Sequence, residues 1–252
     1  MTSFMETVQA MPVKKGSLGV FFLGQAGFLL KLSSGKLLAV DPYLSNCCER
    51  FFGFKRLMPR ILEPAQITLD LLLVSHGHYD HFDPDSVPAL LKPQTAMIAA
   101  QDVKAECEKL GLQGEFTFLS CGESAQCADV QVTAVACDHG ELAPEAVGLL
   151  IRAEGKTVYY MGDTAYRPDL LDDPALQNVD LLLLPINGAF GNLNEQQAAQ
   201  VVAKLRPRLA VPCHYWNFAE HGGNPGLFQQ AMAEVAENCP YRLMAQGEGI
   251  LI

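Results

Sequence analysis

A dense cluster of candidate metal ligands lies in the segment Ser75–Pro84. Within it are His76, His78, Asp80 and His81, so the segment holds three of the chain's six histidines. Alternate residues of an extended or turning segment project to the same side, which predicts that His76, His78 and Asp80 face one point. His81 would then turn toward a second, neighbouring metal. Imidazole and carboxylate together suit zinc, manganese or iron. The alternative interpretation is a surface turn that happens to be rich in histidine.

Three more candidate ligands each follow a strand-like apolar run later in the chain. They are His139, Asp163 and His214. A single polar residue at a strand end is more often an ordinary hydrogen-bonded group than a ligand. Here, however, three metal-competent side chains occupy the same kind of position, and five of the six histidines then belong to one scheme. The sequence therefore predicts a metal site assembled from several strand ends.

The elements that would position these residues alternate between strands and helices. Apolar runs bounded by Gly, Pro or Asp predict strands, and Asp or Asn before an amphipathic run predicts a helix start. Asp83 and Pro84 fit the cap and first residue of such a helix. The predicted strands are 18–24, 26–32, 36–40, 71–74, 95–100, 116–119, 130–136, 147–153, 157–161, 181–185 and 209–212, with two short strands at the end, and the predicted helices are 84–91, 102–110, 194–205 and 225–237. Because no linker or repeat interrupts them, we expect one α/β domain over residues 1–252, with mixed sheets covered by helices.

A long irregular segment, 43–66, is predicted to be a lid or a substrate loop. Lys55 and Arg56 in this loop could bind a phosphate or carboxylate of the substrate, and a solvated basic turn is the alternative. Tyr215 and Trp216 follow a candidate ligand and could line the pocket, with buried packing as the alternative. All four are candidate substrate contacts.

Two further polar residues lie outside the ligand scheme. Asp41 ends a predicted strand and could hold a ligand histidine by its other ring nitrogen, although a simple Asp-Pro turn explains it equally well. His221, in a glycine-rich loop, is the one histidine left over. We expect it to be a surface residue rather than a mobile substrate contact.

Composition restricts the partners and the compartment. The net charge of −10 argues against nucleic acid as a partner, since such binding needs clustered Lys and Arg. No apolar run approaches the roughly 18 residues of a membrane span, and the first residues do not resemble a signal peptide. The eight cysteines lack any CxxC pair, so we expect reduced, mostly structural thiols in a cytoplasmic protein. Cys137 and Cys213, beside candidate ligands, are expected to be structural as well.

The order of the candidate ligands resembles that of the metallo-β-lactamase superfamily of metal-dependent hydrolases. The matching features run from about residue 18 to the C-terminus. The resemblance implies a four-layer αββα sandwich with two divalent metal ions, manganese or zinc, at the edge of the sheets. Iron is disfavoured because iron-dependent redox members usually have Glu at the position of His78. The implied ligands are His76, His78 and His139 for one metal, Asp80, His81 and His214 for the other, and Asp163 as the bridge.

Within that superfamily, the chain is most similar to the L-ascorbate-6-phosphate lactonase family, which is manganese-dependent and opens a sugar lactone. The similar segments are Leu23–Phe28, Val40–Ser45, Gly53–Pro59 and Val211–Phe218, besides the histidine cluster. The chain departs from this family by being shorter and by having Cys213 where a second histidine is expected. N-acylphosphatidylethanolamine phospholipase D has a similar but more distant core.

The resemblance implies a dinuclear hydrolase in which a hydroxide held between the metals attacks a small, anionic, sugar-phosphate-like lactone or ester. Asp80 would be catalytic, orienting the hydroxide or taking its proton. The partner would be a small-molecule substrate, and whether the protein forms a homo-oligomer is left open. A phosphodiesterase or phospholipase D-like hydrolase is the alternative enzyme. A metal-binding but non-catalytic interaction protein is disfavoured, because every ligand position is filled.

Overall fold

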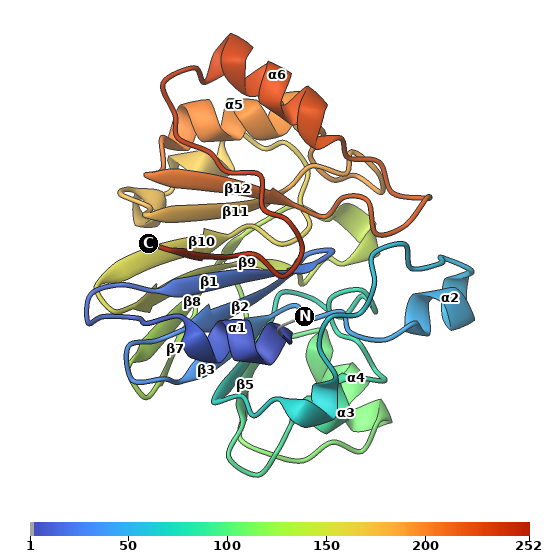
Figure 1. Ribbon diagram of the computed structural model, residues 1–252. Helices are drawn as coiled ribbons and strands as arrows, with labels where there is room; N and C mark the ends of the chain where they lie inside the picture. The colour runs from blue at the N-terminus through green and yellow to red at the C-terminus, as the bar shows by residue number, and fades with distance from the viewer. Residues whose placement is uncertain (1–2) are drawn as a thin grey trace.

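The computed structural model describes residues 3–252. Two mixed β-sheets pack face to face, and helices cover their outer faces (Figure 1). Helices α5 (Glu195–Leu205) and α6 (Pro225–Val235) cover one sheet, and α1 (Phe4–Ala10), α3 (Val87–Leu90) and α4 (Val103–Lys109) cover the other. The predicted four-layer αββα fold class is thus confirmed.

The first sheet has seven strands in the order β13-β1-β2-β3-β4-β5-β6. β13 and β1 to β3 are antiparallel, whereas β3 to β6 are parallel, with α3 and α4 as crossovers between the parallel strands. The strands are β1 (Gly19–Gly24), β2 (Gly27–Lys31), β3 (Leu37–Val40), β4 (Leu71–Val74), β5 (Ala96–Ala100), β6 (Phe116–Leu119) and β13 (Gly249–Leu251).

The second sheet has six strands in the order β12-β11-β10-β9-β8-β7. β7 to β10 are antiparallel, and β10 to β12 are parallel. The strands are β7 (Ser124–Cys127), β8 (Val130–Ala136), β9 (Val147–Ala153), β10 (Lys156–Tyr160), β11 (Leu181–Pro185) and β12 (Leu209–Cys213).

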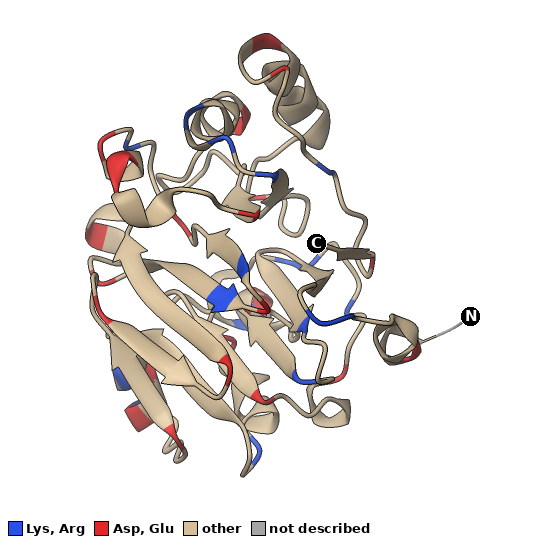
Figure 2. Cartoon of the chain, turned by 90° about the vertical axis from the view of Figure 1, so that its left-hand side faces the viewer, with Lys and Arg blue, Asp and Glu red and all other residues tan. Residues whose placement is uncertain are grey.

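Most of these strands are buried on both faces, which explains their nearly uninterrupted apolar sequences. In β1, Val20 and Phe22 join the core between the sheets, while Phe21 joins a second core beneath α1, α3 and α4. Across the strands of the described chain, only Lys31, Arg152 and Lys156 are charged. Charged residues accordingly lie mainly on loops and helices (Figure 2). The alternation of side chains fixes the register, because a one-residue slip would exchange the two cores.

The carboxyl ends of several strands meet at one edge of the sandwich. β1 and β3 run in the same direction because each is antiparallel to β2, and β4 is parallel to β3. By the same reasoning β8 and β10 share a direction, and β12 follows it through β11. Residues that follow these strands are therefore brought to a common edge, where open α/β sheets usually bind ligands.

Several predicted boundaries are wrong for local reasons. The helix predicted at 84–91 begins only at Val87, and residues 84–86 form a turn. The Asp83 carboxylate caps this turn by accepting from the amides of Asp85 and Ser86, and it also accepts from the amides of Leu44 and Ser45. Asp102 precedes α4 without capping it through its side chain and accepts from the amide of Gly77 instead. The elements not predicted in the described chain are α1, β7, α2 (Cys47–Phe52) and four short 3₁₀ helices (Pro64–Gln66, Gly140–Leu142, Leu170–Asp172 and Pro174–Leu176), and one closing strand is seen there rather than two.

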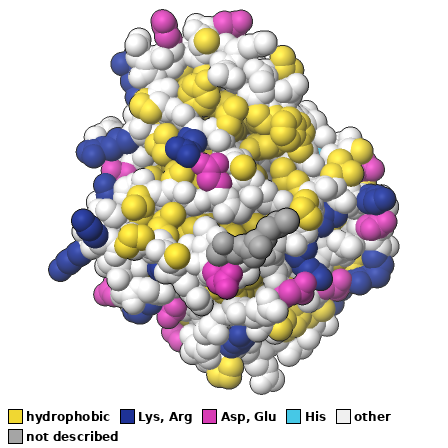
Figure 3. All heavy atoms as spheres, viewed as in Figure 1, with side chains coloured by type: hydrophobic (Ala, Val, Ile, Leu, Met, Phe, Trp, Pro, Cys, Tyr) yellow, Lys and Arg dark blue, Asp and Glu magenta, His cyan; other side chains and the backbone are white. Residues whose placement is uncertain are grey.

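The surface adds two observations on partners. In the view of Figure 3, basic side chains are scattered among acidic and uncharged ones, with no continuous basic area on that face. Within residues 3–252, no helix combines the length and the apolar character needed to cross a membrane.

Candidate metal centre

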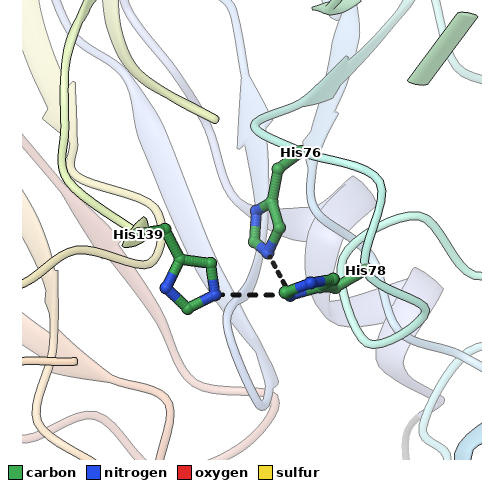
Figure 4. A group of neighbouring side chains, drawn as sticks. All are labelled: His76, His78 and His139. Atoms are coloured by element: carbon green, nitrogen blue, oxygen red, sulfur yellow. Dashed lines mark hydrogen bonds between the residues drawn. The ribbon is translucent and has the colours of Figure 1, made fainter. Parts of the chain in front are cut away.

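Three histidines from two sheets converge on one point (Figure 4). His76 and His78 follow β4, and His139 follows β8. The Nδ1 of His78 lies 3.1 Å from the Nε2 of His76 and 3.3 Å from the Nε2 of His139. The Nε2 of His78 donates to the backbone carbonyl of Leu142 at 3.1 Å. Because a carbonyl can only accept, this hydrogen bond leaves the Nδ1 lone pair facing the other two rings.

A second group lies beside the first and comprises Asp80, His81 and His214. The Nε2 of His214 is 3.3 Å from both the Nε2 of His81 and the Oδ2 of Asp80. His81 and His214 are completely or almost completely buried, and Asp80 keeps 14% of its side chain exposed. The alternation argument is thus wrong for Asp80, because a turn at residues 79–81 directs Asp80 to the group of His81 and away from His76 and His78.

Asp163, which follows β10, lies between the two groups. Its Oδ1 is 3.3 Å from the Nε2 of His81 and 3.2 Å from the Nε2 of His214. Its Oδ2 is 3.8 Å from the Nε2 of His139. One carboxylate thus presents an oxygen to each group, the placement that a bridging ligand requires.

Asp41 lies beneath His81 and is completely buried. Its Oδ2 accepts hydrogen bonds from the Nδ1 of His81 and the hydroxyl of Tyr160, both at 2.7 Å, and from the hydroxyl of Ser75 at 2.5 Å. Its Oδ1 accepts from the Ser75 amide at 2.8 Å. The Asp41 oxygens are therefore occupied by donors, and the Nε2 of His81 is directed toward His214 and Asp163. Asp41 also forms a third group of close ligand atoms with His76 and His81. With its oxygens occupied by donors, however, its placement suits orienting the ring of His81 better than holding a metal ion.

The donor set fits divalent metal ions. In their neutral forms, His78 and His81 present lone pairs at the nitrogens that face the other ligand atoms, and the carboxylates of Asp80 and Asp163 can only accept. Acceptors that converge in a buried space repel one another unless a cation lies between them. Burial opposes a charge on His81 and on His214, but the neighbouring Asp163 and Asp80 outweigh it and raise the pKa of both, that of His214 to about 9. The second group thus stabilises positive charge.

Three residues at this edge have a strained backbone. Gln25, Asp41 and His214 all have positive φ angles, of 54°, 43° and 61°. Side-chain residues rarely adopt this conformation, and it persists only where the surroundings enforce it, most often at functional sites. One such constraint is a hydrogen bond of 2.7 Å from the amide of His214 to the carbonyl of Gln25, which joins the β1–β2 turn to the end of β12.

Gln25 and His221 also lie at the site: the sequence contained no signal for Gln25 itself, and for His221 it favoured a surface residue over a substrate contact. The Nε2 of Gln25 donates to the Oδ2 of Asp80 at 2.8 Å. The ring of His221 is stacked on that of His214, with centroids 4.9 Å apart and an angle of 14°. Burial, together with the neighbouring His214, lowers the pKa of His221 to about 4. The expectation of a surface residue at 221 was therefore wrong. Only the similar segment Leu23–Phe28 had pointed to the region of Gln25.

An apolar cavity of about 510 Å³ opens over the centre. It is lined by Cys48, Phe52, Phe54, Gly77, His78, Tyr79, Asp80, Glu106, His139, Leu142, Asp163, Phe190, Phe218 and His221. Part of the predicted loop, with α2, forms one wall. Among the described residues that line the cavity, none is Lys or Arg.

The four predicted substrate contacts lie elsewhere. Arg56 donates to the carbonyls of Tyr43, Ser45 and Met58 at 2.8 to 2.9 Å, so its guanidinium supports the loop from within. Lys55 is exposed and does not line the cavity. Tyr215 is buried in the core with its hydroxyl donating to the carbonyl of Met244, and Trp216 is exposed outside the cavity.

The cysteines do not take part in the ligand groups. All eight, each within the described chain, have free thiols. Burial raises the pKa of Cys137 to about 12 and raises that of Cys213 well above its ordinary value. Both thiols therefore stay protonated near neutral pH, and a thiol is a poor metal ligand.

Comparison with known proteins gives the family. The family described as "Beta-lactamase superfamily domain" matches residues 19–214. A UPF0173 metal-dependent hydrolase of Anaeromyxobacter sp. (strain K) is 30% identical over 88% of this chain and 84% of its own length. A second, of Pelotomaculum thermopropionicum, is 28% identical over 92% and 98%.

Solved structures agree on the fold. A metallo hydrolase of the archaeon Ignicoccus hospitalis has a TM-score of 0.74 at 23% identity, covering 94% of this chain and 98% of that one. An isothiocyanate hydrolase from Delia radicum gut bacteria has a TM-score of 0.74 at 18% identity, covering 92% and 98%. The chain therefore belongs to the metallo-β-lactamase superfamily, among the UPF0173 metal-dependent hydrolases.

Proposed function

We propose that the protein is a dinuclear hydrolase that opens a small lactone or cleaves a small ester. The observation that carries this proposal is the pair of adjacent ligand groups that share Asp163 at the base of a cavity. When bound, two divalent ions such as manganese or zinc lower the pKa of water and polarise an acyl oxygen. Hydrolysis then gives the hydroxyl of water to the acyl carbon and its proton to the leaving oxygen.

The residues around the ligands have distinct tasks in this proposal. Asp41 fixes the ring of His81, and Gln25 holds one oxygen of the Asp80 carboxylate. Because Asp80 also lines the cavity, it can accept a hydrogen bond from the attacking water and orient it. The largely apolar lining of the cavity lowers the local dielectric constant, which strengthens each of these electrostatic contacts.

The family resemblance implied an anionic, sugar-phosphate-like substrate, with Lys55 and Arg56 as its candidate contacts. Since neither residue lines the cavity, the anionic group is not part of the proposal. The likeness to the ascorbate-6-phosphate lactonase family remains a prediction, and the relatives reported above are UPF0173 hydrolases.

The test compares substrate classes on the metal-loaded protein. We expect hydrolysis of lactones or aryl esters, little hydrolysis of bis(p-nitrophenyl) phosphate, and in Asp80→Asn a large loss of rate together with a lower metal content, because Asp80 belongs to the second ligand group. Activity confined to the phosphodiester would instead assign a phosphodiesterase. Full metal binding without turnover of any of these compounds would favour a non-catalytic role.

A further inference from the structure

Four phenylalanines form one wall of the cavity above the metal centre. We call Phe52, Phe54, Phe190 and Phe218 the aromatic wall. The Phe54 ring lies in the middle, with its centroid 6.1 Å from that of Phe52 and 6.0 Å from those of Phe190 and Phe218. The four residues come from α2 and its following segment, the loop after β11 and the loop after β12. Three segments far apart in the sequence thus build a continuous apolar surface.

The aromatic wall reaches from the ligand groups to the mouth of the cavity. At the inner end, the rings of Phe54, Phe190 and Phe218 pack against that of His221, with centroids 5.8, 5.3 and 5.0 Å away. Toward the solvent, Phe52 is 56% exposed, and Phe190 is 49% exposed, so Phe190 extends from His221 to the mouth of the cavity. Half-exposed phenylalanines at the mouth of a catalytic cavity gain free energy when an apolar group covers them. The wall therefore leads an apolar group directly to the metal ligands.

The charges in the cavity also favour an uncharged substituent on the substrate. The acidic residues that line it are Asp80, Asp163 and Glu106, and no described lining residue is Lys or Arg. Lys109 contacts two of the lining residues, and its ammonium is engaged by the Glu106 carboxylate and the Tyr79 hydroxyl. A phosphate or carboxylate on the substrate would find no free cationic side chain in the cavity and would meet Glu106 at its edge. An uncharged substituent meets neither obstacle.

We propose that the substrate carries an uncharged alkyl or aryl group, which lies against the aromatic wall while its acyl group lies at the metal ligands. This inference deepens the proposed hydrolytic function and rests on it. It also assigns Phe52 and Phe190 as residues that determine substrate specificity, and gives the α2 segment a role in binding the substrate.

The test uses ligands that bind without reacting. The probes are 2-alkylcyclopentanones of increasing chain length, in which a methylene replaces the ring oxygen of a lactone, titrated calorimetrically into the metal-loaded protein. Each added methylene should tighten binding about fourfold until the chain leaves the wall. Phe190→Ala and Phe52→Ala should each weaken binding of the longest ketone about tenfold and leave that of cyclopentanone itself unchanged.

Phe51→Ala is the matched control. Phe51 is the neighbour of Phe52 on α2 and is 50% exposed, but it does not line the cavity. Its substitution should leave the chain-length dependence intact. Because all three side chains are about half exposed, folding should be preserved in each variant, which thermal unfolding checks directly.

The possible results distinguish a failure of this inference from a failure of the proposed hydrolytic function. Affinity that does not depend on chain length, or tighter binding of a phosphate-bearing ketone, overturns the inference even if simple lactones are hydrolysed. Chain-dependent binding that is lost in Phe190→Ala supports it even if none of the lactones tested is hydrolysed. In that second case only the proposed reaction would have to be revised.

Discussion

Asp41→Asn is the substitution that tests most directly how the metal centre is built. The Asp41 carboxylate accepts four hydrogen bonds, from the amide and hydroxyl of Ser75, from Tyr160 and from His81. Asparagine has nearly the same shape but replaces one oxygen by a donor. In one orientation its NH₂ group meets the amide of Ser75, and in the other it meets the donors at His81, Tyr160 and Ser75.

The magnitude follows from the orientation that loses least. The orientation that places the NH₂ group toward the Ser75 amide breaks one buried hydrogen bond to a charged acceptor, which is worth about 1.5–3 kcal/mol. The other three hydrogen bonds remain, but their acceptor no longer carries a charge. We therefore expect the free energy of unfolding of the metal-free protein to fall by about 3 kcal/mol. The ring of His81 also loses its charged acceptor, which should lower metal affinity about 10- to 100-fold, or about 1.4–2.7 kcal/mol.

The assay is competition with a chromophoric chelator, combined with urea unfolding of the metal-free protein. Asp83→Asn is the matched control, since Asp83 is equally buried and accepts hydrogen bonds from Leu44, Ser45 and Ser86 but from no histidine. It should lose comparable stability and keep its metal affinity. In Asp41→Asn, only the metal ion held by the group of His81 should bind more weakly.

Two results would refute this reasoning. One is an unchanged metal affinity in Asp41→Asn, which would mean that His81 needs no charged acceptor or is not a ligand. The other is an equal loss of affinity in Asp83→Asn, which would reduce the effect to general destabilisation.

Three further substitutions test other parts of the site. His78→Ala should lower the metal content from about two to about one ion per chain by elemental analysis, and an unchanged content would contradict the ligand assignment. Gln25→Met removes the hydrogen bond to Asp80, so kcat should fall about 10- to 100-fold at unchanged metal content, and kinetics equal to wild type would leave Gln25 without this role. Arg56→Ala removes three hydrogen bonds to loop carbonyls and should lower the free energy of unfolding by about 3 kcal/mol in urea. A higher KM for a phosphate-bearing substrate with intact stability would instead restore Arg56 as a substrate contact.

The parts of the fold that could be predicted are those with strong local signals. Leu71–Val74 and Leu181–Leu184 are unbroken apolar runs. Such runs predict buried strands without any knowledge of the elements that pack against them. β7 was missed because its four residues, Ser124–Cys127, are half polar and gain their pairing from β8. α1 was missed although Ser3 and Glu6 form a capping box, since a helix of seven residues is marginal without its packing partners.

The residues of the candidate site also divide into those that local sequence signals could place and those that they could not. Residues that directly follow strongly predicted strands, such as His76 and His214, could be placed at one edge from the sequence alone. The role of His221 depends on a loop that folds back over His214, and the inward position of Arg56 depends on carbonyls of its own loop. Neither has a local signature, because a glycine-rich loop or a basic pair can be oriented in many ways. The turn at Tyr79 that separates Asp80 from His78 was equally invisible to the rule of alternation.

Because the ligand groups join distant parts of the chain, the metals would act as reversible cross-links. His78 and His139 are 61 residues apart, and His81 and His214 are 133 apart. Closing loops of this size restricts the unfolded chain, and a covalent link across about 100 residues is worth about 4–5 kcal/mol. Loss of metal should therefore loosen the contact between the two sheets as well as stop catalysis. The metal-free protein should then be cleaved by proteases more readily than the metal-loaded protein.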